Sequence, residues 1–96
     1  MRHYNLPVNY KELKVWERKI VREQYRFEQN FKCFYCKCSL HEPPPKEILD
    51  KPLDLSLFPE GFLDYPIHLQ QDHKTGMTEG AVHAYCNGIM WQYEHR

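Results

Sequence analysis

Two pairs of metal-ligand residues, about fifty positions apart, constrain this 96-residue chain more than any other feature. The first pair is Cys33-x-x-Cys36 and the second is His83-x-x-Cys86. Each spacing lets a tight turn present two side chains to one ion, and three thiolates with one imidazole are a common structural zinc set. A chain of this length buries only about 60–65% of its unfolded surface, so a bound ion would add needed stability. We therefore predict a structural Zn²⁺ site made by these four residues.

Other uses of the cysteines fit the sequence less well. A Cys-x-x-Cys pair also marks thioredoxin-like redox motifs, but those lie in a βαβ context that this chain does not show. Cys38 is left over, and we expect it to be a small buried side chain, because a Cys-x-Cys pair makes a poorer chelate loop. The first ten residues lack the apolar core of a signal peptide, so we expect a cytoplasmic protein, in a host cell if viral, with reduced thiols.

A long helix is predicted over about residues 10–30. The segment from Asn9 to Glu12 reads as a capping box, which favours a helix start near Tyr10. Apolar residues then recur at three-, four- and seven-residue spacings and predict one buried face: Leu13, Trp16, Ile20, Phe27 and Phe31. Basic residues recur every four positions and predict a solvent-facing ridge on the opposite side: Lys14, Arg18, Arg22 and Arg26.

The net charge of zero, from 13 basic and 13 acidic residues, hides a segregation along the chain. Residues 1–37 carry nine basic and four acidic side chains (9 − 4 = +5), whereas residues 38–73 carry two and seven (2 − 7 = −5). Mutual neutralisation within the fold is one interpretation. The other is that the basic ridge binds nucleic acid through phosphate contacts that weaken as salt rises.

The rest of the chain predicts a small α+β fold in a single domain over residues 1–96. Residues 43–66 form a proline-rich loop, because their prolines prevent a long helix. Short strands are expected at 67–70 and 81–83, and a terminal helix from Asn87. No apolar run approaches the roughly 18 residues needed to span a bilayer, so no membrane partner is expected.

The stretch from Gln70 to Asn87 resembles the core motif of the HNH, or His-Me finger, nucleases. Residues 70–76 read Gln-Gln-Asp-His-Lys-Thr-Gly, and residues 80–87 read Gly-Ala-Val-His-Ala-Tyr-Cys-Asn. The phage recombination endonuclease VII group is the nearest likeness. Its pattern runs Asp-His-x-His-x-Thr-Gly, then Arg-Gly, then Cys or His, two residues and Cys-Asn. The resemblance covers roughly residues 15–92.

The resemblance implies a zinc-braced ββα-metal fold with one catalytic Mg²⁺ or Mn²⁺ at the scissile phosphate of DNA. By position, Asn87 corresponds to a ligand of that ion, and His73 to a phosphate contact. The zinc would fix the orientation of Asn87, because this residue directly follows Cys86. The branched-DNA enzymes of this group are dimers, so a homodimer is possible.

The chain departs from the family pattern at its centre. Gln70 stands where the family has a metal-binding Asp, and Gln71 where it has the general-base His; Glu79 replaces an Arg. A glutamine amide cannot take a proton from water near neutral pH. Three explanations stay open: a nuclease deliberately changed from His to Gln at position 71, a register shifted so that Asp72 and His73 act as ligand and base, or a naturally silent descendant.

We therefore expect a divalent-metal-dependent DNA endonuclease of the HNH type, with little sequence specificity and in a form that Gln71 inactivates or slows. The alternative is a non-catalytic zinc-finger module that binds DNA or a protein partner.

Overall fold

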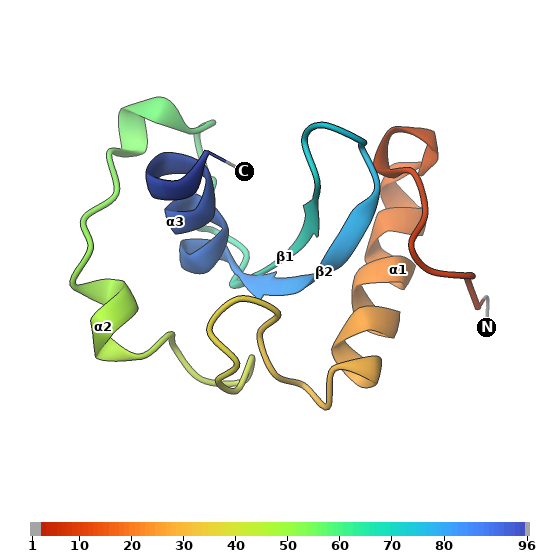
Figure 1. The fold of residues 1–96 in the computed structure, drawn as a ribbon, viewed down its shortest axis with the longest axis horizontal. Coiled ribbons are helices and arrows are strands. Elements are labelled where there is room, and N and C mark those ends of the chain that lie inside the picture. The colour runs from red at the N-terminus through yellow and green to blue at the C-terminus, as the bar shows by residue number, and fades with distance from the viewer. Residues whose placement is uncertain (1–2, 96) are drawn as a thin grey trace.

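The computed structural model describes residues 3–95, which form a small α+β fold around a two-stranded hairpin (Figure 1). The helices and strands, in chain order, are η1 (Tyr10–Glu12), α1 (Val15–Glu28), α2 (Lys46–Leu49), η2 (Leu55–Leu57), β1 (Ile67–Gln71), β2 (Thr78–His83) and α3 (Ala84–Glu94). Helix α1 lies on one side of the hairpin and α3 on the other. Within the described residues, no helix has both the length and the apolar character needed to cross a membrane.

The first helix is shorter than the predicted range of 10–30. The Asn9 side chain accepts the N–H of Lys11 at 3.0 Å, as a cap should, but it caps the 3-10 turn η1. The chain then becomes extended at Leu13, which places that side chain in the core, and α1 begins at Val15. Positive φ angles at Asn30 and Phe31 prevent the helix from continuing.

The predicted apolar face of this helix is wrong. Val21 and Tyr25 are the buried residues of α1, whereas Phe27 is 74% exposed. The Tyr25 hydroxyl lies 2.8 Å from the hydroxyl of Thr78, so this face of α1 docks on β2. Of the five residues expected on the buried face, Leu13 is the one that is buried.

The basic ridge is therefore not on the side opposite the core. Tyr25 lies seven residues, about two turns, after Arg18, so the two share a helix face. Arg18, Arg22 and Arg26 are half-buried beside the core, and only Lys14 of the ridge is exposed as predicted.

Strands β1 and β2 pair antiparallel with His68 opposite Val82, close to the two predicted strands. Gln70 pairs with Gly80 and Gln71 with Thr78, so Glu79 is the extra residue of a β-bulge on β2. The connecting turn is held by the Asp72 carboxylate, which accepts the N–H groups of Lys74 (2.7 Å) and Thr75 (3.3 Å). Gly76 completes the turn with a φ of 77°, a conformation that glycine adopts without strain.

The predicted proline-rich loop contains two short helical segments, α2 and η2, and it packs along α3. The Phe58 ring stacks on Phe62 and meets Trp91 edge-on, with centroid distances of 4.5 and 5.4 Å. Helix α3 begins at Ala84, earlier than predicted, so Cys86 and Asn87 both lie in its first turn. The close fit of this helix to the loop thus fixes both residues relative to the hairpin.

The close packing around Gly80 leaves no room for a side chain. A Cβ atom there would lie 2.9 Å from Phe34 and 2.6 Å from the Gln29 amide oxygen, which accepts the Ala81 N–H. We expect Gly80→Ala to lower the free energy of unfolding by about 1–3 kcal/mol in urea titrations. Lys74→Ala, on the exposed turn, is the control, and equal stability of the two variants would contradict this packing.

Candidate metal centre and adjoining cleft

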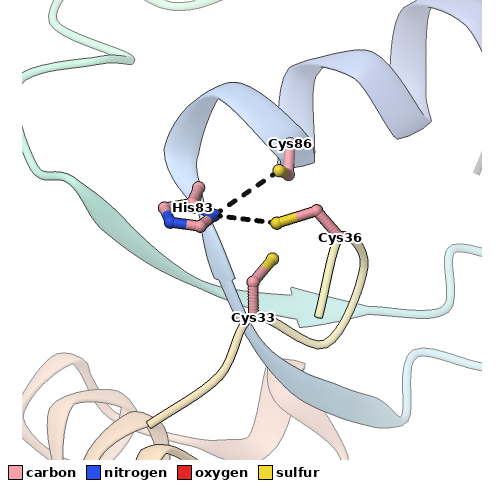
Figure 2. A group of neighbouring side chains, drawn as sticks. All are labelled: Cys33, Cys36, His83 and Cys86. Carbon is pink, nitrogen blue, oxygen red and sulfur yellow. Dashed lines mark hydrogen bonds between the residues drawn. The ribbon is translucent and has the colours of Figure 1, made fainter. Parts of the chain in front are cut away.

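The four predicted zinc ligands come together from two distant parts of the chain (Figure 2). Cys33 and Cys36 lie in the loop after α1, where the Lys37 N–H bonds to the Cys33 carbonyl at 3.0 Å and closes a tight turn. His83 ends β2 and Cys86 lies in the first turn of α3. Their ligand atoms all lie within 4.8 Å of one another. Among the residues that the structure describes, no other group of three or more His, Cys, Asp or Glu side chains could hold a metal ion.

The spacing of the cluster fits a tetrahedral zinc ion. The Nδ1 atom of His83 lies 3.5 Å from the Cys36 sulfur and 3.6 Å from the Cys86 sulfur. Ligands placed about 2.0–2.1 Å (nitrogen) and about 2.3 Å (sulfur) from one ion in tetrahedral geometry are about 3.5 Å apart. The donor set and its spacing therefore fit a structural zinc site.

The backbone orients the imidazole of His83 for this role. Its Nε2 atom lies 2.9 Å from the carbonyl oxygens of both Ser39 and Glu42. Because carbonyl oxygens only accept hydrogen bonds, Nε2 carries the proton and donates it. The Nδ1 lone pair is then directed at the cysteine sulfurs, as ligation of a metal requires.

The thiols of the cluster depend on one another electrostatically. A hydrogen bond from Cys86 lowers the pKa of Cys33 to about 4, while burial raises the pKa of Cys36 to about 11. The pKa of Cys86 is also raised, chiefly by its hydrogen bond to Cys33. One thiolate thus forms easily, and two further negative charges beside it require a cation.

Cys38 does not belong to this cluster. It is exposed, so the expectation that it is a buried small side chain is wrong. The Cys38 carbonyl accepts the Cys33 N–H at 2.8 Å, so Cys38 supports the turn from Cys33 to Cys36 through its backbone. The side chain is consequently free to face outward.

A cleft made of two adjoining chambers lies along β1 and α3, and the chambers share four lining residues, among them Asn87, which directly follows Cys86 of the metal centre. The first chamber, of about 390 Å³, lies between α1, β1 and α3, and its polar and aromatic lining includes Tyr10, Arg18, Arg22, Tyr65, His68 and Asn87. The second, of about 330 Å³, is lined in part by Gln70, Gln71, His73, Phe58, Trp91 and Asn87. Of the nine predicted site residues outside the metal cluster, the fold therefore places six around one cleft: Arg18, Arg22, Gln70, Gln71, His73 and Asn87.

The four predicted nucleic-acid-binding residues divide between the cleft and the outer surface. Arg18 and Arg22 line the first chamber, whereas Lys14 and Arg26 line neither. The Arg18 guanidinium lies over the Tyr10 ring, 4.3 Å from its centroid, and its Nε atom is buried without a hydrogen-bond partner. Arg26 instead pairs with Glu23 at 2.6 Å. The positive charge in the cleft therefore comes from Arg18 and Arg22, the two middle residues of the ridge.

His68 is a cleft residue that the sequence alone does not single out. Its Nδ1 atom lies 3.1 Å from Nδ2 of Asn87, so the Asn87 amide donates to the ring and turns its oxygen away from it. Burial lowers the pKa of His68, with a smaller contribution from the charge of Arg22, so the ring is neutral near pH 7. A histidine on a short mixed strand gives no sequence signal for this contact with α3.

The predicted catalytic residues of the motif have different surroundings. Gln70 is only 2% exposed, and its amide donates to the Gln71 carbonyl at 2.9 Å. His73 is exposed at the rim, and the Asp72 carboxylate is engaged in the turn. No carboxylate among the described residues lines either chamber. Because Mg²⁺ usually binds through one or two carboxylates, this donor set does not fit a catalytic Mg²⁺.

Comparisons with known proteins identify no relative. No protein-family model, curated protein or solved structure matches the chain. The resemblance to HNH nucleases therefore stays a prediction from the motif.

The metal centre predicts one zinc ion per chain. We expect elemental analysis of the purified protein to give one equivalent of zinc, and removal of the ion by a chelator to unfold the chain, because ligand binding and folding are coupled. Circular dichroism during chelation measures this.

Two serine variants test the assignment of ligands. Cys86→Ser should lose most of the zinc, whereas Cys38→Ser should keep it, because the Cys38 thiol lies outside the cluster. Retention of zinc by Cys86→Ser, or its loss from Cys38→Ser, would contradict the ligand set.

Proposed function

We propose that the chain is a zinc-braced DNA endonuclease domain of the HNH type whose hydrolytic step is weakened by Gln70 and Gln71. The observation that carries this proposal is the position of Asn87. It follows Cys86 of the metal centre and stands where the chamber with Arg18 and Arg22 meets the chamber with Gln71 and His73. An antiparallel hairpin followed directly by a helix agrees with the ββα arrangement that the motif implies.

Each part of the cleft has a distinct task in this function. The guanidinium groups of Arg18 and Arg22 bind a phosphodiester through charge-assisted hydrogen bonds. The zinc centre holds the first turn of α3 in place, and His68 orients the Asn87 amide from the opposite side. His73, at the rim, reaches a neighbouring phosphate. These groups position a phosphodiester without base-specific contacts, so binding depends little on sequence.

The weak point of the site is proton transfer. In HNH nucleases a divalent ion supplies charge stabilisation at the scissile phosphate. In this chain Gln71 can hydrogen-bond a water molecule but cannot deprotonate it, and general-base catalysis is worth about 10²–10⁴-fold in rate. Slow or absent cleavage therefore follows from this side chain, while DNA binding does not depend on it.

A second candidate function is DNA binding without hydrolysis. The cleft combines two arginines with neutral amides, and no carboxylate from the described residues lines it. Such a cleft favours an anion over a divalent cation, which is the specific observation behind this alternative.

Plasmid nicking separates the two candidates. With Mg²⁺ or Mn²⁺ present, we expect the double variant Gln70→Asp, Gln71→His to nick supercoiled DNA about 10²-fold or more faster than the unchanged chain, because it restores a carboxylate for the ion and an imidazole for the base. Gln71→His alone, which leaves the chamber without a carboxylate, should gain less. Gln71→Leu is the matched control and should stay inactive.

A third variant tests Asn87 in the active background. Asn87→Ala combined with Gln70→Asp and Gln71→His should abolish nicking and keep its full zinc content, since the amide is not one of the four zinc ligands. If every form, including Gln70→Asp with Gln71→His, fails to nick, the endonuclease proposal is wrong and the binding function remains.

A further inference from the structure

The positive charge in the cleft is small. Arg18 and Arg22 are the two cations of the first chamber, and within the described part of the chain neither has an ion-pair partner. Arg18 is held over the Tyr10 ring, 4.3 Å from its centroid, which fixes the guanidinium at the chamber. A guanidinium without an ion-pair partner can donate charge-assisted hydrogen bonds to an anionic oxygen in the chamber. The chamber is therefore suited to one or two phosphate groups.

Aromatic rings stand beside these cations. Tyr65 lines the same chamber and is 76% exposed, while Phe62 is shared by both chambers. Trp91, 42% exposed, borders the second chamber. Exposed rings next to a basic groove are the usual platform on which unpaired bases stack. The rings are thus placed to stack on a base, and the arginines are placed to bind its phosphate.

The shape of the cleft distinguishes a single strand from a duplex. Proteins that read duplex DNA insert a protruding helix or ribbon into a groove, whereas these cations and rings are recessed in a concavity of about 390 Å³. In a duplex the faces of the bases are stacked inside and cannot reach Tyr65. An unpaired nucleotide presents its base and its phosphate together, and a chamber of this volume is within the range of ligand pockets.

We propose that the first chamber binds an unpaired nucleotide of single-stranded DNA, with its phosphate on Arg18 and Arg22 and its base on Tyr65. This inference rests on the proposed function and names the form of DNA at the same cleft. It predicts that the chain binds single-stranded or unpaired segments in preference to continuous duplex.

Fluorescence anisotropy of the zinc-loaded chain, without added Mg²⁺ or Mn²⁺, tests this preference. The probes are a labelled oligothymidine of about twelve nucleotides, within the usual site size, and a labelled duplex of equal length. We expect the single strand to bind about tenfold more tightly. The logarithm of its affinity should fall with the logarithm of salt concentration at a slope of about −1.4, for two phosphate contacts.

Two matched pairs of variants assign the contacts. Arg22→Gln should reduce that slope by about 0.7, while Lys19→Gln, an equal loss of charge at an exposed position of the same helix, should not change it. Tyr65→Ala should weaken single-strand binding about tenfold, and Tyr65→Phe, which keeps the ring, should restore it. Phe27→Ala removes a ring of similar exposure outside the cleft and should have no effect.

Equal or tighter binding of the duplex would overturn this inference, as would equal losses from Tyr65→Ala and Phe27→Ala. Zinc content and thermal unfolding of each variant show that the fold is intact, and the Tyr65→Phe comparison stands even if Tyr65→Ala unfolds. Single-strand preference without nicking by any variant leaves this inference standing and removes the endonuclease. Nicking by the double variant Gln70→Asp, Gln71→His, together with tighter duplex binding, would keep the endonuclease and remove this inference.

Discussion

The meeting of three cysteine thiols and one imidazole at a single point is the constraint on which the rest of the structure depends. The cluster joins the loop after α1 to the junction of β2 and α3, and the Phe34 N–H, which donates to the Ala81 carbonyl at 2.9 Å, supports the same connection. Burial and hydrogen bonding let Cys33 ionise while they oppose ionisation of Cys36 and Cys86. A divalent cation held by the four residues would make all three thiolates favourable and would stabilise the fold from its centre.

The metal centre also determines where the cleft is. Cys86 belongs to the metal cluster and Asn87 lines the cleft. Since both lie in the first turn of α3, they cannot move independently. Tyr25 sets the opposite wall, because its contact with Thr78 on β2 turns Arg18 and Arg22 toward β1. The cleft is thus the space left between two helices that are fixed to the same hairpin.

Local sequence patterns predicted the local features of this protein well. The ligand spacing at Cys33 and His83 specifies a turn and an ion, and the cluster forms as predicted. The positions of both strands followed from short patterns, within a few residues. The prediction of which face of α1 is buried was wrong. The spacing of Trp16, Ile20 and Phe27 is as regular as that of a buried face, but periodicity does not say which of two faces meets the hairpin, and the hydrogen bond of Tyr25 to Thr78 spans 53 positions. The same limit applies to His68, whose contact with Asn87 depends on the packing of α3.

The β-bulge in the hairpin has a consequence for the way β2 joins the two ends of the fold. Its extra residue, Glu79, lies on β2 opposite the step from Gln70 to Gln71. Because side chains alternate between the two faces of a strand, removal of one residue would turn every side chain on one side of the deletion to the other face. Thr78, whose hydroxyl meets Tyr25, and His83, which belongs to the metal cluster, lie on opposite sides of the bulge. A chain without Glu79 would therefore keep only one of these two contacts in place.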